Sequence, residues 1–226
     1  MNRKRSHPGS AARRRDIIRA ALACFSEIGF SRTTMADIRR RAKASTGSIY
    51  HQFESKEHLA AEVYLEGIGD HQAGLIAALE GEADARRGIR AMIAHHLGWV
   101  RANDDWARFL FQGRHSALTA EAQQALEELN SELMRRAGRW FDAQVEAGRL
   151  RRLPADIYVA LVAGPYLAHT RRYLSGRACT GVNEAIELLA DAAWRSLAVR
   201  PDGPGTPPRA AAPPGERRSP RNGGKR

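Results

Sequence analysis

The sequence predicts an all-α protein of two domains followed by a disordered tail. Apolar residues recur at helical spacing through residues 11–199, and no stretch alternates apolar and polar residues as a half-buried strand would. Capping residues and glycines divide this pattern into segments of helical length. With 226 residues, of which 43% are hydrophobic, the chain is long enough for one sizeable core or two modest ones.

Composition argues against several classes of protein. No apolar run approaches the roughly 18 residues of a membrane span, and the start MNRKRSHPGSAARRR lacks the apolar segment of a secretion signal. We therefore expect a cytoplasmic protein without a membrane partner. Cys24 and Cys179 are the only cysteines and lie far apart, so neither a disulfide framework nor a metal site is indicated, and no motif predicts a cofactor.

Charge is segregated along the chain. Residues 1–58 hold 13 Lys and Arg against 5 Asp and Glu, and residues 200–226 hold 7 against 2. Residues 59–199, which lie between them, hold 16 against 18. A basic head and a basic tail around a nearly neutral body indicate that one part of the chain meets a polyanion while the body has another role.

The N-terminal part begins with two predicted helices. The first covers residues 11–28 and ends before Gly29, a residue that suits a helix C-cap. The second begins at Thr34, where the sequence TMAD matches a capping box, and it runs to about Ala42. Both predictions depend on local capping chemistry as well as on the apolar pattern.

A third short helix and a long fourth one follow. Ser45 is a plausible N-cap for a helix over residues 46–52, and Ser55 can cap a helix whose apolar positions continue to Leu79. The fourth helix is therefore predicted to lead from the small N-terminal domain into the body of the protein.

The body contains further predicted helices, and one of them includes an internal proline. Pro165 lies within an otherwise helical pattern, so we expect a kink there and not two separate helices. From residue 200 onward Pro, Gly and Arg dominate, which predicts disorder. The further helices are expected at residues 84–102, 104–115, 119–147, 154–174 and 182–199.

Two short helices joined by a four-residue link are typical of a helix-turn-helix. A helix that reads base edges needs short polar side chains and free backbone N–H groups at its N-terminus, where it can enter the major groove. The third helix begins with Ser45, Thr46, Gly47 and Ser48, which meet this need. Gly47 lets the backbone come close to DNA, and the positive end of the helix dipole favours phosphate.

The same region resembles the DNA-binding domain of the tetracycline-repressor (TetR) family. The resemblance rests on TTMADI at residues 33–38 and on AKASTGSIYHQFESKEHL at residues 42–59. It covers about residues 12–60, and the combined motif is specific, whereas an isolated piece such as SxGSxY is weak. The preceding helix also fits the family through Ala21, Leu22, Phe25, Gly29 and Phe30.

The resemblance implies a role for each matching residue. Thr46 and Ser48 would face the groove, whereas Tyr50 and His51 would contact the backbone or flanking bases. The full set of implied DNA contacts is Thr34, Lys43, Ser45, Thr46, Gly47, Ser48, Tyr50, His51 and Lys56, with Thr34 and Lys56 at phosphates. Lys43 departs from the family, which commonly has glycine in the turn, so a positive φ there would be strained.

The resemblance also implies a two-domain organisation. A flexible basic arm at 1–10 and the DNA-binding domain at 11–58 would precede a ligand-binding and dimerisation domain at 59–199 and the tail at 200–226. In the family the last two long helices of each subunit form the dimer interface. Candidate residues for lining a pocket are His95, Trp99, Trp106, Phe109, His115 and Tyr158, although such residues also build ordinary cores.

Function is expected to be transcriptional regulation. The leading hypothesis is a homodimeric repressor that an effector of unknown identity releases from a palindromic operator in double-stranded DNA. A constitutive DNA-binding protein without an effector is the alternative. An enzyme using His95 or His115 as a base ranks last, because no nucleophile, metal or phosphate motif accompanies these residues.

Overall fold

The computed structural model describes residues 8–111 and 119–199 of the chain, and side chains from residue 11 onward. Within these ranges helices are joined by turns, with one isolated bridge between Leu150 and Ala198, so the all-α prediction is confirmed. None of the described helices is long and apolar enough to cross a membrane. The predicted tail, His115 and most of the predicted arm lie outside the described residues.

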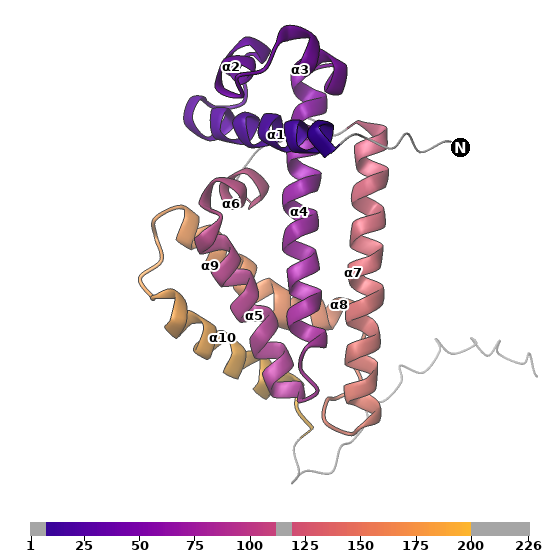
Figure 1. The fold of residues 1–226 in the computed structure, drawn as a ribbon. Helices are drawn as coiled ribbons and strands as arrows, with labels where there is room; N and C mark the ends of the chain where they lie inside the picture. The colour runs from indigo at the N-terminus through magenta and orange to yellow at the C-terminus, as the bar shows by residue number, and fades with distance from the viewer. Residues whose placement is uncertain (1–7, 112–118, 200–226) are drawn as a thin grey trace, which may run out of the picture.

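Three helices pack around the start of a fourth (Figure 1): α1 (Pro8–Ile28), α2 (Met35–Arg41), α3 (Thr46–Gln52) and α4 (Lys56–Glu80). Because each has one apolar face, together they bury a shared core. This core extends two turns into α4, beyond the boundary predicted at residue 58. Its fully buried members include Ile17, Ile18, Ile38, Ile49, Phe53, Leu59 and Val63.

Most of the remaining helices pack around the far half of α4, whereas α6 also packs against α1. In Figure 1, α7 lies along one side of α4, whereas α5 and α10 lie on the other. They share a core with α4 through Leu75 and Leu79. The elements are α5 (Ala85–Ala102), α6 (Asp104–Phe111), α7 (Ala120–Glu146), α8 (Ala155–Tyr158), a π-helical turn (Val159–Ala163), α9 (Gly164–Leu174) and α10 (Val182–Leu197).

The segment around Pro165 is one helical run without a break. α8 continues through the π-helical turn directly into α9, and the Gly164 N–H donates to the Val159 carbonyl across the wider turn. Proline has no N–H and its ring crowds the preceding turn, so a local widening lets the helix continue past it. The expectation of one distorted helix instead of two is confirmed.

Glycines set how closely helices approach one another. In α5, a Cβ added at Gly88 would lie 2.3 Å from the Cζ2 atom of Trp140 on α7. Trp140 is buried, and its Nε1 donates to the Glu82 carbonyl at 3.0 Å, so the indole has little freedom to move. Gly98, in the same helix, has open space where its Cβ would be.

These two glycines give a matched test of the packing. We expect Gly88→Ala to lower the free energy of unfolding by about 1–2 kcal/mol, because overpacking outweighs the gain in helix propensity. Gly98→Ala should raise it by about 0.5–1 kcal/mol, since only the propensity changes. Chemical denaturation of both variants checks this. Equal effects of the two substitutions would contradict the packing of α5 against Trp140.

Candidate DNA-binding surface and ligand pocket

Side chains at the starts of α2 and α3 hold the helix-turn-helix in shape. The Thr34 hydroxyl accepts from the Asp37 N–H at 3.2 Å while the Asp37 carboxylate accepts from the Thr34 N–H at 3.0 Å, which is a complete capping box. Ser45 Oγ accepts from the Ser48 N–H at 3.1 Å. Thr34 and Ser45 therefore have structural roles besides the DNA contacts predicted for them.

The N-terminal end of α3 forms an exposed polar face. Ser45, Thr46 and Gly47 are exposed and Ser48 is half-buried, whereas Ile49 on the opposite face is fully buried. A Cβ at Gly47 would meet nothing within 4 Å, so packing within the chain does not require glycine there. The missing side chain leaves the backbone open to an external partner.

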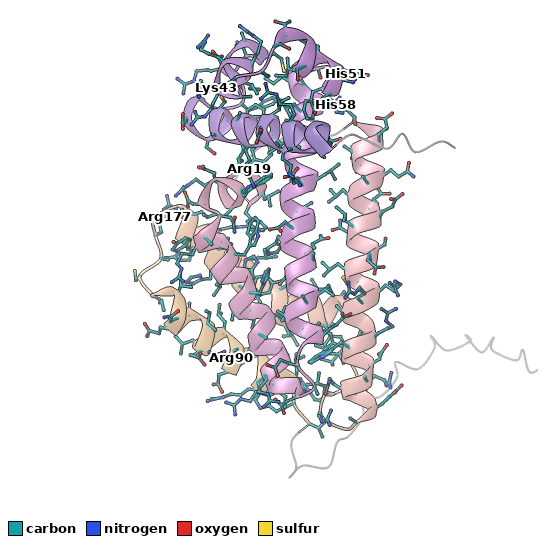
Figure 2. The ribbon with its side chains drawn as sticks, in the orientation of Figure 1. Arg19, Lys43, His51, His58, Arg90 and Arg177 are labelled. Carbon is teal, nitrogen blue, oxygen red and sulfur yellow. The ribbon has the colours of Figure 1, made fainter. Side chains whose placement is uncertain are left out.

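The C-terminal half of α3 continues this surface. Tyr50 is 51% exposed, and His51 is exposed beside it. An aromatic ring left half in solvent contributes little to the core, so it is available for contact with another molecule. Figure 2 shows His51 and Lys43 at the end of the molecule built from α1, α2 and α3, far from Arg90 on α5.

Lys43 has a strained backbone in the turn between α2 and α3. Its φ of 48° is positive, the one such value for a non-glycine residue in the described ranges. The Arg13 guanidinium holds this turn by donating to the Lys43 carbonyl at 2.7 Å and to the Ala42 carbonyl at 3.3 Å. The side chain of Lys43 is exposed and makes no ion pair with any described residue.

The arginines of α2 differ from Lys43 because two of them are paired. Arg41 donates to the Glu27 carboxylate at 2.6 Å, and Arg40 lies 3.5 Å from Asp37. The ion pair with Arg41 lowers the pKa of Glu27. Lys43 is thus an uncompensated positive charge next to the exposed start of α3.

Lys56, at the start of α4, has a contact within the protein that the sequence did not indicate. Its ammonium donates to the Phe30 carbonyl at 2.9 Å and lies 4.5 Å from the centre of the Phe30 ring. These contacts tie the loop after α1 to α4, and an ammonium has further protons to donate. The phosphate contact of Lys56 remains a prediction.

A hollow of about 250 Å³ lies in the second domain, between α4, α5, α7 and the run from α8 to α9. Apolar side chains dominate its surface. Phe141 and Tyr158 stack on one another in its wall, with ring centres 4.7 Å apart. The lining residues are Leu75, Met92, Leu133, Met134, Ala137, Gly138, Phe141, Asp142, Leu153, Ala155, Tyr158, Val159, Val162, Ala163 and Tyr166.

Of the residues predicted to line a pocket, Tyr158 lines this hollow. Trp99 lies elsewhere and donates from Nε1 to the Asp70 carboxylate at 2.8 Å. Phe109 stacks on Phe25 of α1 with ring centres 5.6 Å apart, and the ring of Trp106 lies against α4 at Gly67. These three aromatic residues hold helices together around α4 and α6.

His95 packs against α4 at Gly74, with its Nε2 atom 3.2 Å from the His71 carbonyl, and is also absent from the hollow's lining. The sequence prediction missed the wall formed by α7, where Met134 and Phe141 lie seven residues apart on one side of the helix. A seven-residue spacing of apolar side chains was the sequence signal that could have indicated this wall.

A buried polar chain joins three helices near the hollow. His71 Nε2 of α4 lies 2.8 Å from His96 Nδ1 of α5, and His96 Nε2 lies 2.8 Å from the Thr170 hydroxyl of α9. Burial lowers the pKa of His71 to about 4 and that of His96 to about 2, so both are neutral at physiological pH. In the described part of the chain, no cluster of His, Cys, Asp or Glu could hold a metal ion.

Comparison with known proteins agrees with this geometry. The family model for bacterial regulatory proteins of the tetR family matches residues 17–63. The HTH-type transcriptional repressor KstR2 of Rhodococcus jostii is 30% identical over 155 residues, covering 68% of this chain and 74% of KstR2. The HTH-type transcriptional repressor Rv1474c of Mycobacterium tuberculosis is 27% identical and covers 82% of this chain and 95% of its own length.

Solved structures share the fold over most of the chain, including both domains. A TetR family transcription regulator from Marinobacter aquaeolei superposes with a TM-score of 0.68 at 22% identity, covering 85% of this chain and 98% of that one. The fatty acid degradation regulator FadR from Bacillus halodurans superposes with a TM-score of 0.70 at 15% identity, covering 84% and 97%. At these sequence identities the similarity to the solved structures shows a shared fold and does not indicate a shared ligand.

The strain at Lys43 yields a test that separates stability from DNA binding. Lys43→Gly should raise the free energy of unfolding by about 0.5–1 kcal/mol, because glycine accepts a positive φ. Because Lys43 is predicted to contact DNA, the same substitution should weaken DNA binding and make the fall of log affinity with log salt less steep by about one. Lys43→Arg is the control and should change neither quantity much. A fall in stability for Lys43→Gly would contradict the backbone geometry.

Proposed function

Because the chain belongs to the TetR family of bacterial regulatory proteins, we propose that it represses transcription as a homodimer and leaves DNA when a small molecule fills its second domain. It is a DNA-binding transcriptional regulator and not an enzyme. The observation that carries the proposal is the course of α4, which begins at Lys56, four residues after the end of α3, and reaches the hollow at Leu75.

In the proposed complex α3 enters the major groove. Thr46 and Ser48 contact base edges, Gly47 brings the backbone close to the DNA, and Tyr50 and His51 contact flanking bases or phosphates. Thr34, Lys43, Ser45 and Lys56 supply contacts to the phosphate backbone. The exposure of the start of α3 and the unpaired charge of Lys43 support this assignment. The proposed place of action is the cytoplasm, where bacterial DNA lies.

TetR-family repressors bind DNA as dimers, and the C-terminal helices of this chain offer a surface for a second copy. Leu188 of α10 is 59% exposed and Ile157 of α8 is 38% exposed. Ala160, Gly164 and Ala168 are exposed at helical spacing along α8 to α9, and small residues let helices approach closely. One recognition helix reads too few base pairs for a unique site, whereas a two-fold pair reads a palindrome.

The proposed effector acts through α4. Two recognition helices fit successive major grooves only at one separation, so a ligand that favours another tilt of α4 opposes DNA binding. The position of the hollow against α4, α5 and α7 supports this role. A regulator that binds its site with no response to any ligand in the hollow would instead fit the constitutive alternative.

Dimerisation and operator symmetry can be tested together. We expect the protein to protect a near-palindromic site selected from genomic DNA, with two half-sites about one helical turn apart or a multiple of it. Leu188→Glu should give a folded monomer with at least tenfold weaker operator binding, because it places a charge in the proposed interface. Val199→Glu adds the same charge at another exposed apolar residue, beyond the end of α10. It should leave both the dimeric state and the operator affinity unchanged.

Sedimentation and footprinting provide the measurements. A monomeric wild-type protein at micromolar concentration, or an asymmetric footprint, would overturn the homodimer. A dimeric Leu188→Glu variant would show that the interface lies elsewhere.

A further inference from the structure

Two tyrosines line the hollow, and their hydroxyl groups differ. Tyr158 donates its O–H to the Arg151 carbonyl at 2.6 Å and accepts from the Leu153 N–H at 3.3 Å, so its hydrogen bonds are made within the chain. Tyr166 is 6% exposed, yet its hydroxyl makes no hydrogen bond with any described residue. The buried side-chain polar atoms without a partner in the described residues belong to Gln52, His71, Gln72 and His169, so the unpaired Tyr166 hydroxyl retains accessible surface. Because Tyr166 lines the hollow, this O–H can donate to a ligand there.

The surroundings of Tyr166 keep this donor neutral and protonated. Burial raises the pKa of Tyr166 to about 12. Its ring lies 4.1 Å, centre to centre, from the ring of His96, which is itself neutral. Tyr166 therefore brings an O–H group and no charge to the lining of the hollow.

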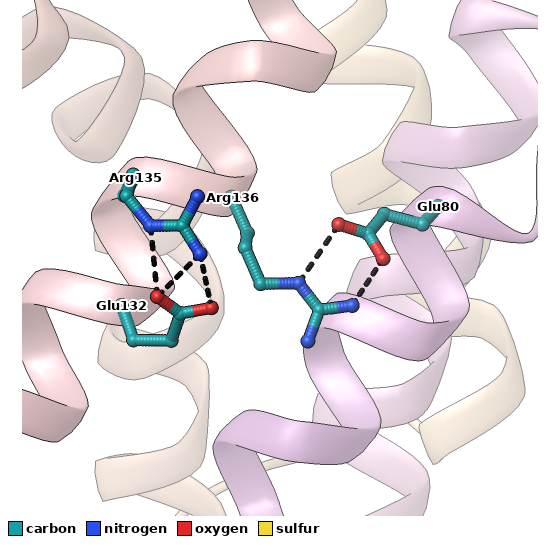
Figure 3. A network of polar contacts seen from close by, with 4 residues as sticks. All are labelled: Glu80, Glu132, Arg135 and Arg136. Carbon is teal, nitrogen blue, oxygen red and sulfur yellow. Dashed lines mark hydrogen bonds and ion pairs between the residues drawn. The ribbon is translucent and has the colours of Figure 1, made fainter.

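The rest of the lining does not favour an anion. None of the lining residues is Lys, Arg or His, and the one carboxylate among them, Asp142, is exposed and would repel an anion. Arg135 and Arg136, which precede the lining residues Ala137 and Gly138 on α7, are both paired (Figure 3).

Arg135 donates to Glu132 of α7, and Arg136 donates from Nε to Glu80 of α4 at 2.9 Å. An anion inside the hollow would lose its hydration without gaining a cation in return.

We infer that the hollow takes an uncharged, mainly hydrocarbon ligand with one hydrogen-bond acceptor, and that the Tyr166 hydroxyl donates to this acceptor. The inference rests on the proposed effector role of the hollow and adds the chemical class of the effector. A volume of about 250 Å³ suits a small molecule or a single medium-length chain. Met92 and Met134 supply flexible walls that adapt to such a chain.

Three probes of equal chain length separate the possibilities. Methyl decanoate is neutral and has carbonyl acceptors, decanoate is an anion, and decylamine is a cation at neutral pH without an acceptor. Calorimetric titration of the full-length dimer should give the highest affinity for methyl decanoate. Tyr166→Phe should weaken methyl decanoate binding about three- to tenfold and leave decylamine binding unchanged, since one hydrogen bond is removed.

The second tyrosine provides the matched control. Tyr158→Phe removes a hydroxyl that the chain itself satisfies, so it should lower the melting temperature and leave the ratio of methyl decanoate to decylamine affinity as in the wild type. Tyr166→Phe should not lower the melting temperature, because its hydroxyl has no partner to lose. Gly138 lines the hollow, and a Cβ added there would meet nothing within 4 Å. We therefore expect the side chain of Gly138→Trp to occupy the hollow and abolish binding of the ester.

The outcomes distinguish this inference from the proposed function. Tighter binding of decanoate or decylamine, or no binding of methyl decanoate, would overturn the ligand class. Ester binding that persists in Gly138→Trp, or that Tyr166→Phe leaves unchanged, would overturn the site. Ester binding that is weakened in Tyr166→Phe and abolished in Gly138→Trp, with an operator affinity that the bound ester does not change, would support the ligand class and contradict the effector role.

Discussion

The structure depends on one helix being shared by two hydrophobic cores. Leu59 and Val63 of α4 are buried with the helix-turn-helix, and Leu75 and Leu79 are buried in the second domain. A helix of 25 residues with continuous backbone hydrogen bonds bends little, so displacement of one end must be accommodated at the other. We therefore propose that α4 couples the exposed face of α3 to the hollow.

Close contacts along the middle of α4 strengthen this coupling. The Trp106 ring lies against Gly67, and the His95 ring lies against Gly74, so α6 and α5 touch the α4 backbone directly. α6 also reaches the first domain, where Phe109 stacks on Phe25. Packed interiors switch between discrete arrangements and do not deform smoothly. We therefore propose that a ligand that moves these helices changes the position of α1 to α3.

Local chemistry made the DNA-binding end predictable, whereas the second domain depends on long-range packing. Thr34 and Ser45 cap their helices as the sequence indicated, because a cap involves residues only three positions apart. Which aromatic rings line a cavity depends on where distant helices leave space. Trp99 is hydrogen-bonded to Asp70 and Phe109 stacks on Phe25, so neither ring lines the cavity. The hollow instead forms where α7 meets the run from α8 to α9. The bond from Lys56 to Phe30 spans 26 residues and has no local sequence signal.

Thermodynamic reciprocity tests the central claim, the coupling of the two ends through α4, most directly. The test compound is chosen because it binds the wild-type protein but not the Gly138→Trp variant, so its binding requires an open hollow. Operator affinity is then measured at rising concentrations of this compound. We predict that the operator Kd rises by about 5- to 150-fold and then saturates, and that operator DNA weakens binding of the compound by the same factor. A compound that saturates the hollow while the operator Kd stays constant would contradict it.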